Sequence, residues 1–234
     1  DLTAATLAPV TAVTTPTNDS TPNYTFSSSE AGTITYGGSC SSSTTSATTD
    51  NNTITLVSLS DGTYSDCTIT VTDAAGNSVT LNISSFVIDT TAPTVAEVTA
   101  VTTPTTDTTP DYTFSSDEAG SITYGGSCSS STTSATTDNN TINLTSLSAG
   151  TYSNCTMTVT DAAGNTSNTL AIPSFTVAEP EQMGGSIQGG QLSLSTAVTT
   201  LAGTGSTGSA NGTGTSASFY YPNGITTDGT NLYV

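Results

Sequence analysis

Apolar side chains recur at every second position in several stretches of the first 178 residues. The alternating pairs are Tyr24 with Phe26, Ile34 with Tyr36, Ile54 with Leu56, Ile69 with Val71, and Leu81 with Ile83. Thr and Ser fill the positions between them, as in antiparallel strands with one buried and one solvated face. The sequence therefore predicts short β-strands here, and it shows no helical periodicity.

This strand pattern occurs twice. Val13–Phe26 returns with few changes as Val101–Phe114, and Ile34–Ile54 returns letter for letter as Ile122–Ile142, a period of 88 residues. Turn signals such as Asp73–Asn77 separate the predicted strands. About seven short strands in each period predict a β-sandwich, and a period this long indicates two complete domains in tandem.

Three short motifs carry a family resemblance: "DGTY", "VTDAAGN" and the "DTTAP" joint at Asp89–Pro93. With them the chain, over roughly residues 5–177, resembles the bacterial Ig-like repeats of large secreted and surface proteins. The resemblance implies an all-β fold of two tandem Ig-like β-sandwiches, residues 1–89 and residues 90–178. "LSDGTY" and "LSAGTY" are similar to the tyrosine corner of Ig-type domains, which implies that Tyr64 and Tyr152 bond back onto their turns.

Four cysteines stand at matched places in the two copies. Cys67 has the inward parity of Ile69 and Val71, and Cys40 follows the strand that holds Ile34. We expect disulfides between Cys40 and Cys67 and between Cys128 and Cys155. Each would close a loop of about 28 residues, worth about 3–4 kcal/mol. Free buried thiols and a two-cysteine metal site are the alternatives. Disulfides indicate an oxidising, extracellular or cell-surface location.

Charge narrows the function classes. The chain has 18 acidic residues and no Lys, Arg or His, so its formal net charge is -18. Such a surface repels phosphate backbones and anionic membranes, which argues against nucleic-acid binding and membrane association. The chain has no histidine to act as a general base, and its acidic residues fall in predicted turns or linkers. We therefore expect that the protein is not an enzyme. No apolar run is long enough to span a membrane, and the start at Asp1 is typical of a processed secreted protein or a fragment of one.

The acidic residues suggest one metal site. In an Ig-type sandwich the loops that carry Asp117 and Glu118, Asp138, and Asp161 share one pole, and Asp89 reaches this pole from the first copy. Five carboxylates without a basic partner would repel each other unless a hard cation lies among them. A structural Ca²⁺ at the joint is therefore the only cofactor that the sequence predicts. The alternative is a set of solvated turn residues.

The C-terminal part changes character. Residues 179–197 have the composition of a linker, and residues 198–234 resemble the opening of an NHL-type β-propeller through "YYPNG" and "LYV". A partial blade cannot close a propeller, so the segment is either a blade fragment or an extended assembly strand. The stretch Gln191–Leu201 alternates like a strand, and we expect it to add to an open sheet edge of another subunit. Its proposed assembly residues are Gln191, Leu192, Leu194, Val198 and Leu201.

These features favour a structural or adhesive extracellular protein, a subunit of a surface filament or stalk that associates with itself. Surface glycans and other proteins are further expected partners. Sequons of the Asn-x-Ser/Thr type, Asn165 among them, and the dense Ser and Thr suit a glycosylated surface. One alternative is a spacer in a secreted ligand-binding protein whose propeller lies beyond Val234, and another is an accessory module of a polysaccharide-degrading enzyme.

Overall fold

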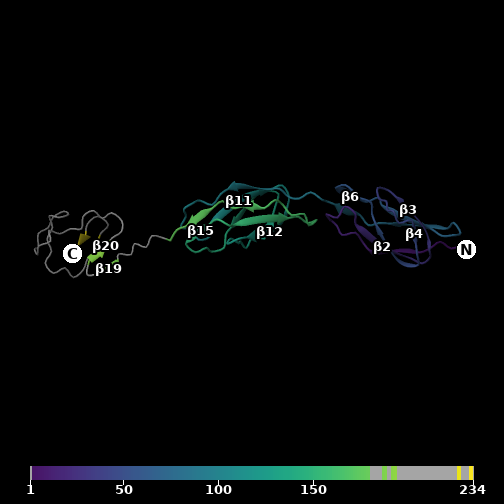
Figure 1. Ribbon diagram of the computed structural model, residues 1–234, viewed down its shortest axis with the longest axis horizontal. Coiled ribbons are helices and arrows are strands. Elements are labelled where there is room, and N and C mark those ends of the chain that lie inside the picture. The colour runs from purple at the N-terminus through teal and green to yellow at the C-terminus, as the bar shows by residue number, and fades with distance from the viewer. Residues whose placement is uncertain (1, 180–185, 189–190, 194–225, 228–231, 234) are drawn as a thin grey trace, which may run out of the picture. The chain divides into compact units, whose positions relative to one another are not determined.

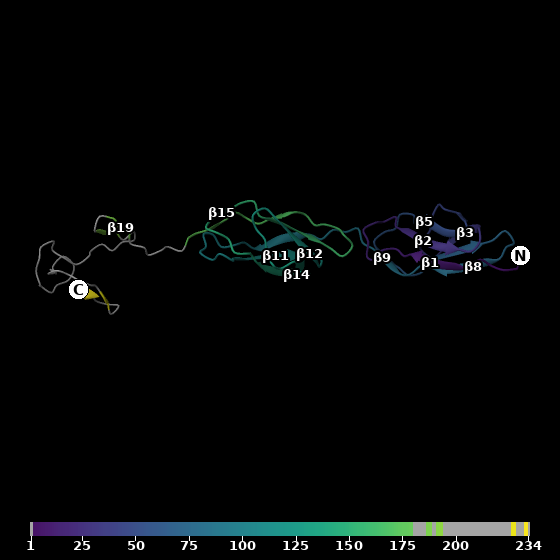
Figure 2. The ribbon, with the colours of Figure 1, turned by 90° about the horizontal axis from the view of Figure 1, so that it is seen from below.

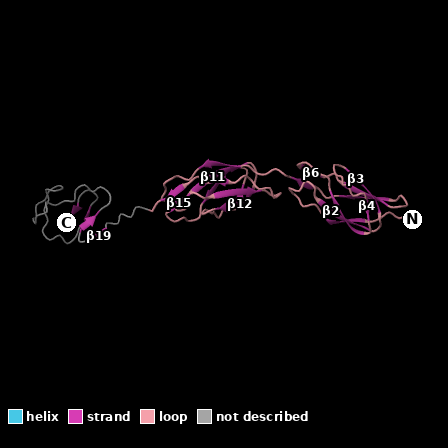
Figure 3. Cartoon of the chain, in the orientation of Figure 1, coloured by secondary structure: helices cyan, strands magenta, loops and turns pink. Residues whose placement is uncertain are grey.

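The computed structural model describes residues 2–179, 186–188, 191–193, 226–227 and 232–233. The chain divides into two compact units, Asp1–Ala178 and Glu179–Val234. The described residues form strands, turns and loops without a helix, as Figure 3 shows. None of them belongs to a helix that is long and apolar enough to cross a membrane. The all-β prediction is confirmed.

The unit Asp1–Ala178 contains both repeats, with nine strands in each. The strands of the first repeat are β1 (Leu7–Thr11), β2 (Asn23–Ser28), β3 (Gly32–Gly37), β4 (Ser46–Ala47), β5 (Asp50–Thr55), β6 (Gly62–Tyr64), β7 (Thr68–Thr72), β8 (Ser78–Asn82) and β9 (Phe86–Ile88). Those of the second are β10 (Val95–Thr99), β11 (Asp111–Ser116), β12 (Gly120–Gly125), β13 (Ser134–Ala135), β14 (Asp138–Asn143), β15 (Gly150–Tyr152), β16 (Thr156–Thr160), β17 (Leu170–Ala171) and β18 (Phe175–Val177).

Each repeat is a sandwich of antiparallel sheets (Figures 1 and 2). In the first repeat the sheet β1-β2-β5 faces the sheet β4-β3-β7-β8, and β6 pairs with β9. The second repeat has the equivalent sheets β10-β11-β14 and β13-β12-β16-β17, with β15 paired to β18. The prediction of tandem β-sandwiches is confirmed.

The cores lie between the sheets, on the faces that the alternation predicts. Phe26, Ile69 and Val71 are fully buried. The outward threonines pair across strands, as in the 2.8 Å contact between the hydroxyls of Thr70 and Thr80. Such pairs satisfy polar groups on the solvated face without any charge.

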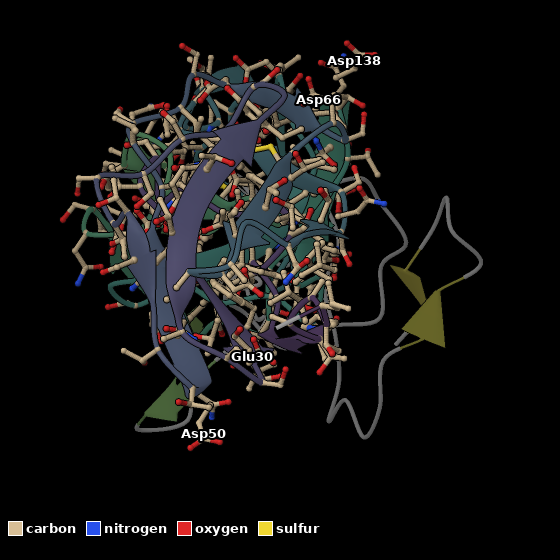
Figure 4. The ribbon with its side chains drawn as sticks, turned by 90° about the vertical axis from the view of Figure 1, so that its right-hand side faces the viewer. Glu30, Asp50, Asp66 and Asp138 are labelled. Atoms are coloured by element: carbon tan, nitrogen blue, oxygen red, sulfur yellow. A yellow bond between two sulfur atoms is a disulfide. The ribbon has the colours of Figure 1, made fainter. Side chains whose placement is uncertain are left out.

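A disulfide joins two neighbouring strands of one sheet in each repeat, at the end of the β3–β7 pair in the first and of the β12–β16 pair in the second. Cys40 bonds to Cys67 and Cys128 bonds to Cys155, and the Cα atoms of each pair lie 5.2 Å apart. All four cysteines are buried, and a sulfur–sulfur bond is visible in Figure 4. The predicted pairing is confirmed, and both alternatives, free thiols and a cysteine metal site, are wrong.

The tyrosine corners are also present. The Tyr64 hydroxyl donates to the Ser60 carbonyl at 2.8 Å, and the Tyr152 hydroxyl donates to the Ser148 carbonyl at 2.9 Å. The Tyr64 ring stacks on Phe86, with ring centroids 5.4 Å apart. Each corner thus ties a surface turn to the core.

The described residues of the unit Glu179–Val234 form two short antiparallel strand pairs. β19 (Ser186–Gln188) pairs with β20 (Gln191–Ser193), and β21 (Thr226–Thr227) pairs with β22 (Leu232–Tyr233). Two of the five predicted assembly residues, Gln191 and Leu192, lie in β20. The other three, Leu194, Val198 and Leu201, lie outside the described residues, as does most of the segment 198–234 that resembles a propeller blade. Both strands of the first pair, β19 and β20, lie within residues 179–197, which have the composition of a linker; β20 falls in the stretch Gln191–Leu201 that the sequence predicts to be strand-like, and the sequence does not predict β19.

Candidate functional site

The joint between the repeats, Asp89–Thr94, is held by hydrogen bonds from the first sandwich. The Asp61 carboxylate accepts from the Thr90 amide at 2.9 Å and from the hydroxyls of Thr90 and Thr91, each at 2.8 Å. The bonds from Thr90 and Thr91 lower the pKa of Asp61 below its usual value. Sequence reasoning missed this role, although one signal exists, because Ala149 replaces Asp61 in the second copy.

The second sandwich meets the joint with the turn Asp161–Asn165. The Asn165 side-chain amide donates to the Asp89 carbonyl and to the Asp161 carboxylate, both at 2.8 Å. The backbone amide of Asn18, from the first repeat, donates to the Ala163 carbonyl at 3.2 Å. Because Asn165 is only 9% exposed and its amide nitrogen is engaged, this sequon is closed to a glycan while the joint is formed.

Three carboxylates converge beside this turn. Asp89, Glu118 and Asp161 each offer an oxygen within 4.8 Å of the others, and all three residues are half-buried. Partial burial raises the pKa of Glu118, and the neighbouring charges of Asp89, Asp161 and Asp117 raise it further. Repulsion of this kind, in a chain without a basic residue, is what a hard cation relieves, because carboxylate oxygens are the ligands that Ca²⁺ prefers.

The other two predicted ligands, Asp117 and Asp138, do not belong to this cluster. The Asp117 carboxylate accepts from the Thr94 amide at 2.6 Å, which lowers its pKa, so Asp117 fixes the backbone at the end of the joint. Asp138 begins β14 with a φ of 72° and is exposed, and its side chain points away from the ribbon in Figure 4. The structure thus brings together three of the five carboxylates. A loop assignment can predict which end of a sandwich a residue occupies, but not the direction of its side chain.

Comparison with known proteins supports the domain type. Residues 9–90 match the family model of a bacterial Ig-like domain. The second copy repeats this sequence and its strands. The family match covers the first repeat, and both repeats have the β-sandwich fold. The resemblance of residues 198–234 to a propeller blade gains no support from the comparisons, and the search of curated proteins gives no match.

Three solved structures resemble the Ig-like modules. The first contains fibronectin(III)-like modules of Clostridium thermocellum CbhA, at 11% identity and a TM-score of 0.40, covering 78% of this chain and 100% of that one. The second is invasin, a bacterial integrin-binding protein, at 17% identity and a TM-score of 0.27, covering 76% of this chain and 39% of that one.

The third is SGBP-B from the Bacteroides ovatus mixed-linkage glucan utilization locus, in complex with a mixed-linkage heptasaccharide. Its identity is 19% and its TM-score 0.23, and the match covers 70% of this chain and 44% of that one. The chain therefore spans less than half the length of the second and third structures.

Proposed function

We propose that the protein is an extracellular structural or adhesive protein, a subunit of a surface filament or stalk. The observation that carries this proposal is the pair of disulfide-bonded Ig-like modules whose joint is hydrogen-bonded on both sides, by Asp61 and by Asn165. A joint of this kind suits a module that transmits force between its neighbours. The disulfides favour an oxidising location outside the cell.

The surface supports the same proposal. Its sheets present Thr and Ser hydroxyls in hydrogen-bonded pairs, and the chain has no positive charge. Proteins and neutral glycans fit such a surface as partners, and nucleic acids do not. Among the described residues we find no arrangement that calls for a catalytic role.

Self-association through strand addition would build the filament. The stretch Gln191–Leu201 alternates apolar and polar residues and carries no charge, and its first residues, in β20, already adopt a strand conformation. A strand of this kind gains main-chain hydrogen bonds when it adds to an open edge of another subunit. The alternative function, a spacer for a ligand-binding domain, requires no self-association.

The assembly is tested with the full chain. We expect light scattering and electron microscopy to show concentration-dependent polymers for the unmodified protein. Leu192→Ser combined with Leu194→Ser should reduce assembly at least tenfold, because the added strand loses its apolar face. Leu192→Val with Leu194→Val is the matched control, which keeps the apolar pattern and the strand propensity. Persistence of a monomer at high concentration would exclude the filament and favour the spacer.

We further propose that Ca²⁺ binds between Asp89, Glu118 and Asp161. Calcium at a hundredfold excess over its dissociation constant should stabilise the folded chain by about 2.7 kcal/mol. Glu118→Gln should abolish most of this gain, because it removes one of the three negative charges of the cluster. Asp138→Asn, at the carboxylate that points away, is the matched control and should leave the gain unchanged. Calorimetric titration measures calcium binding to both variants. Equal calcium affinity of Glu118→Gln and Asp138→Asn would refute the site.

A further inference from the structure

One glycosylation sequon occurs in both repeats. It reads Asn-Asn-Thr at Asn51–Thr53 in the first copy and again at Asn139–Thr141 in the second, 88 residues later. Every other sequon of residues 2–179 occurs in one copy, because the matching stretch of the other copy lacks its Asn or its Ser or Thr. These single sequons begin at Asn18, Asn23, Asn82, Asn143, Asn154 and Asn165.

The shared sequon begins where the chain leaves a tight turn. Residues 48–49 separate β4 from β5, and Asp50 opens β5 with a φ of 74°. Asp138 opens β14 in the same way, with a φ of 72°. In Figure 4 the Asp50 side chain projects beyond the end of the ribbon. Asn51 and Asn139 follow these turns directly, at an end of the domain where a bulky surface group has room.

The side chains of the shared sequon are exposed and unengaged. Asn51 and Asn139 are both exposed, and among the described residues neither side chain takes part in a hydrogen bond. The next residue is different, because Asn52 is buried and its Nδ2 donates to the carbonyls of Thr48 at 2.8 Å and Asp50 at 3.0 Å. Asn52 thus holds the turn from inside and leaves Asn51 to the solvent.

Two of the single sequons have no amide proton to spare. The Asn143 Nδ2 donates to the Thr109 carbonyl at 2.7 Å and to the Asp111 carboxylate at 2.9 Å. The Asn165 Nδ2 likewise donates two bonds at the joint. An N-linked sugar replaces one of the two Nδ2 protons. A glycan at either place would therefore remove a hydrogen bond of the folded chain, whereas a glycan on Asn51 removes none.

Two more single sequons are crowded. Asn154 packs against Gly126, where a Cβ atom would lie 3.2 Å from the Asn154 Cγ. The Asn18 side chain lies at the joint, where a Cβ atom on Gly164 would be 3.5 Å from its Nδ2. The shared sequon therefore combines exposure and a free Nδ2 in both copies.

We infer that Asn51 and Asn139 are modification sites that carry N-linked glycans. The inference goes beyond the proposed function and does not depend on self-association. Its co-reactant is an oligosaccharide joined to a lipid pyrophosphate, supplied with a transferase of the secretory route. Nδ2 forms a bond to the anomeric carbon of the sugar, and the bond from that carbon to the phosphate oxygen breaks. The pyrophosphate leaves with the electron pair, and Nδ2 gives up one proton to a base of the transferase.

Mass spectrometry of the full protein secreted by its natural host tests the two sites. Trypsin does not cut a chain without Lys or Arg, but an Asp-specific protease releases residues 50–60 and 138–160. Fragmentation that keeps the sugar attached then assigns it to its residue. We expect a glycan on Asn51 and on Asn139, and none on Asn143 or Asn165.

A bare Asn51 or Asn139 in the folded protein would overturn the inference. A glycan on Asn143 or Asn165 of the folded protein would also overturn it, because the selection by free Nδ2 protons would then be wrong.

Variants of the full chain, made in the same host, separate the sequon from the fold. Asn51→Gln with Asn139→Gln should lower the mass by both glycans, and an unchanged mass would contradict the assignment. Thr53→Val with Thr141→Val should lose the same mass, because it removes the sequon hydroxyl and keeps a β-branched side chain in the strand. Thr53→Ser with Thr141→Ser is the matched control, which keeps both sequons and should keep both glycans.

Discussion

Replacing Cys40 and Cys67 with alanine is expected to lower the free energy of unfolding of the first repeat by about 3–4 kcal/mol. The two cysteines are 27 residues apart, and the bond between them removes the entropy of an open loop of that length from the unfolded chain. A small sandwich has a limited apolar core, so this term is a large part of its stability.

Calorimetry of the full chain measures the effect. The first repeat should melt roughly 20 °C below the second, which serves as an internal reference. Cys128→Ala with Cys155→Ala should reverse the order of the two transitions. If both repeats of the Cys40→Ala, Cys67→Ala variant melt together at the melting temperature of the unmodified protein, the prediction is wrong.

Gly38→Ala is expected to destabilise the first repeat by about 3 kcal/mol, as the sum of left-handed backbone strain and overpacking. Gly38 has a φ of 71°, and a Cβ atom there would overlap the Asp66 backbone carbonyl. The chain after β3 lies this close to the start of β7 because Gly37 pairs with Thr68 and Cys40 is bonded to Cys67. The backbone has no room to move away without straining the disulfide.

Gly76→Ala is the matched control. Gly76 also has a positive φ, 90°, but a Cβ atom there would meet nothing within 4 Å. Its substitution should therefore show the backbone strain alone, about 1–2 kcal/mol. Denaturant unfolding separates the two, and similar losses for both glycines would show that the contact with Asp66 is unimportant.

The strand pattern could be predicted because its cause is local. Alternation puts Phe26, Ile69 and Val71 on one face whatever the rest of the chain does, and a cysteine on the same parity must point inward. The requirement for glycine at position 38 could not be predicted this way. It depends on how closely two strands approach, and the sequence of one strand does not contain that distance.

The position of the candidate site could be predicted, but the directions of its side chains could not. Topology predicted the pole, and Asp89, Glu118 and Asp161 meet there. It did not predict that Asp117 bonds to the Thr94 amide or that Asp138 turns away, because both depend on local backbone angles. The part played by Asp61 was visible only as a difference between the copies.

The difference between Asp61 and Ala149 limits how a protein of this type can be lengthened by duplicating its repeats. Asp61 secures the joint that follows the first repeat, and Ala149 offers no carboxylate to a joint that would follow the second. A gene lengthened by duplicating the first repeat would reproduce a secured junction each time. Duplicating the second would insert junctions without that anchor, so the order of the two modules is not interchangeable.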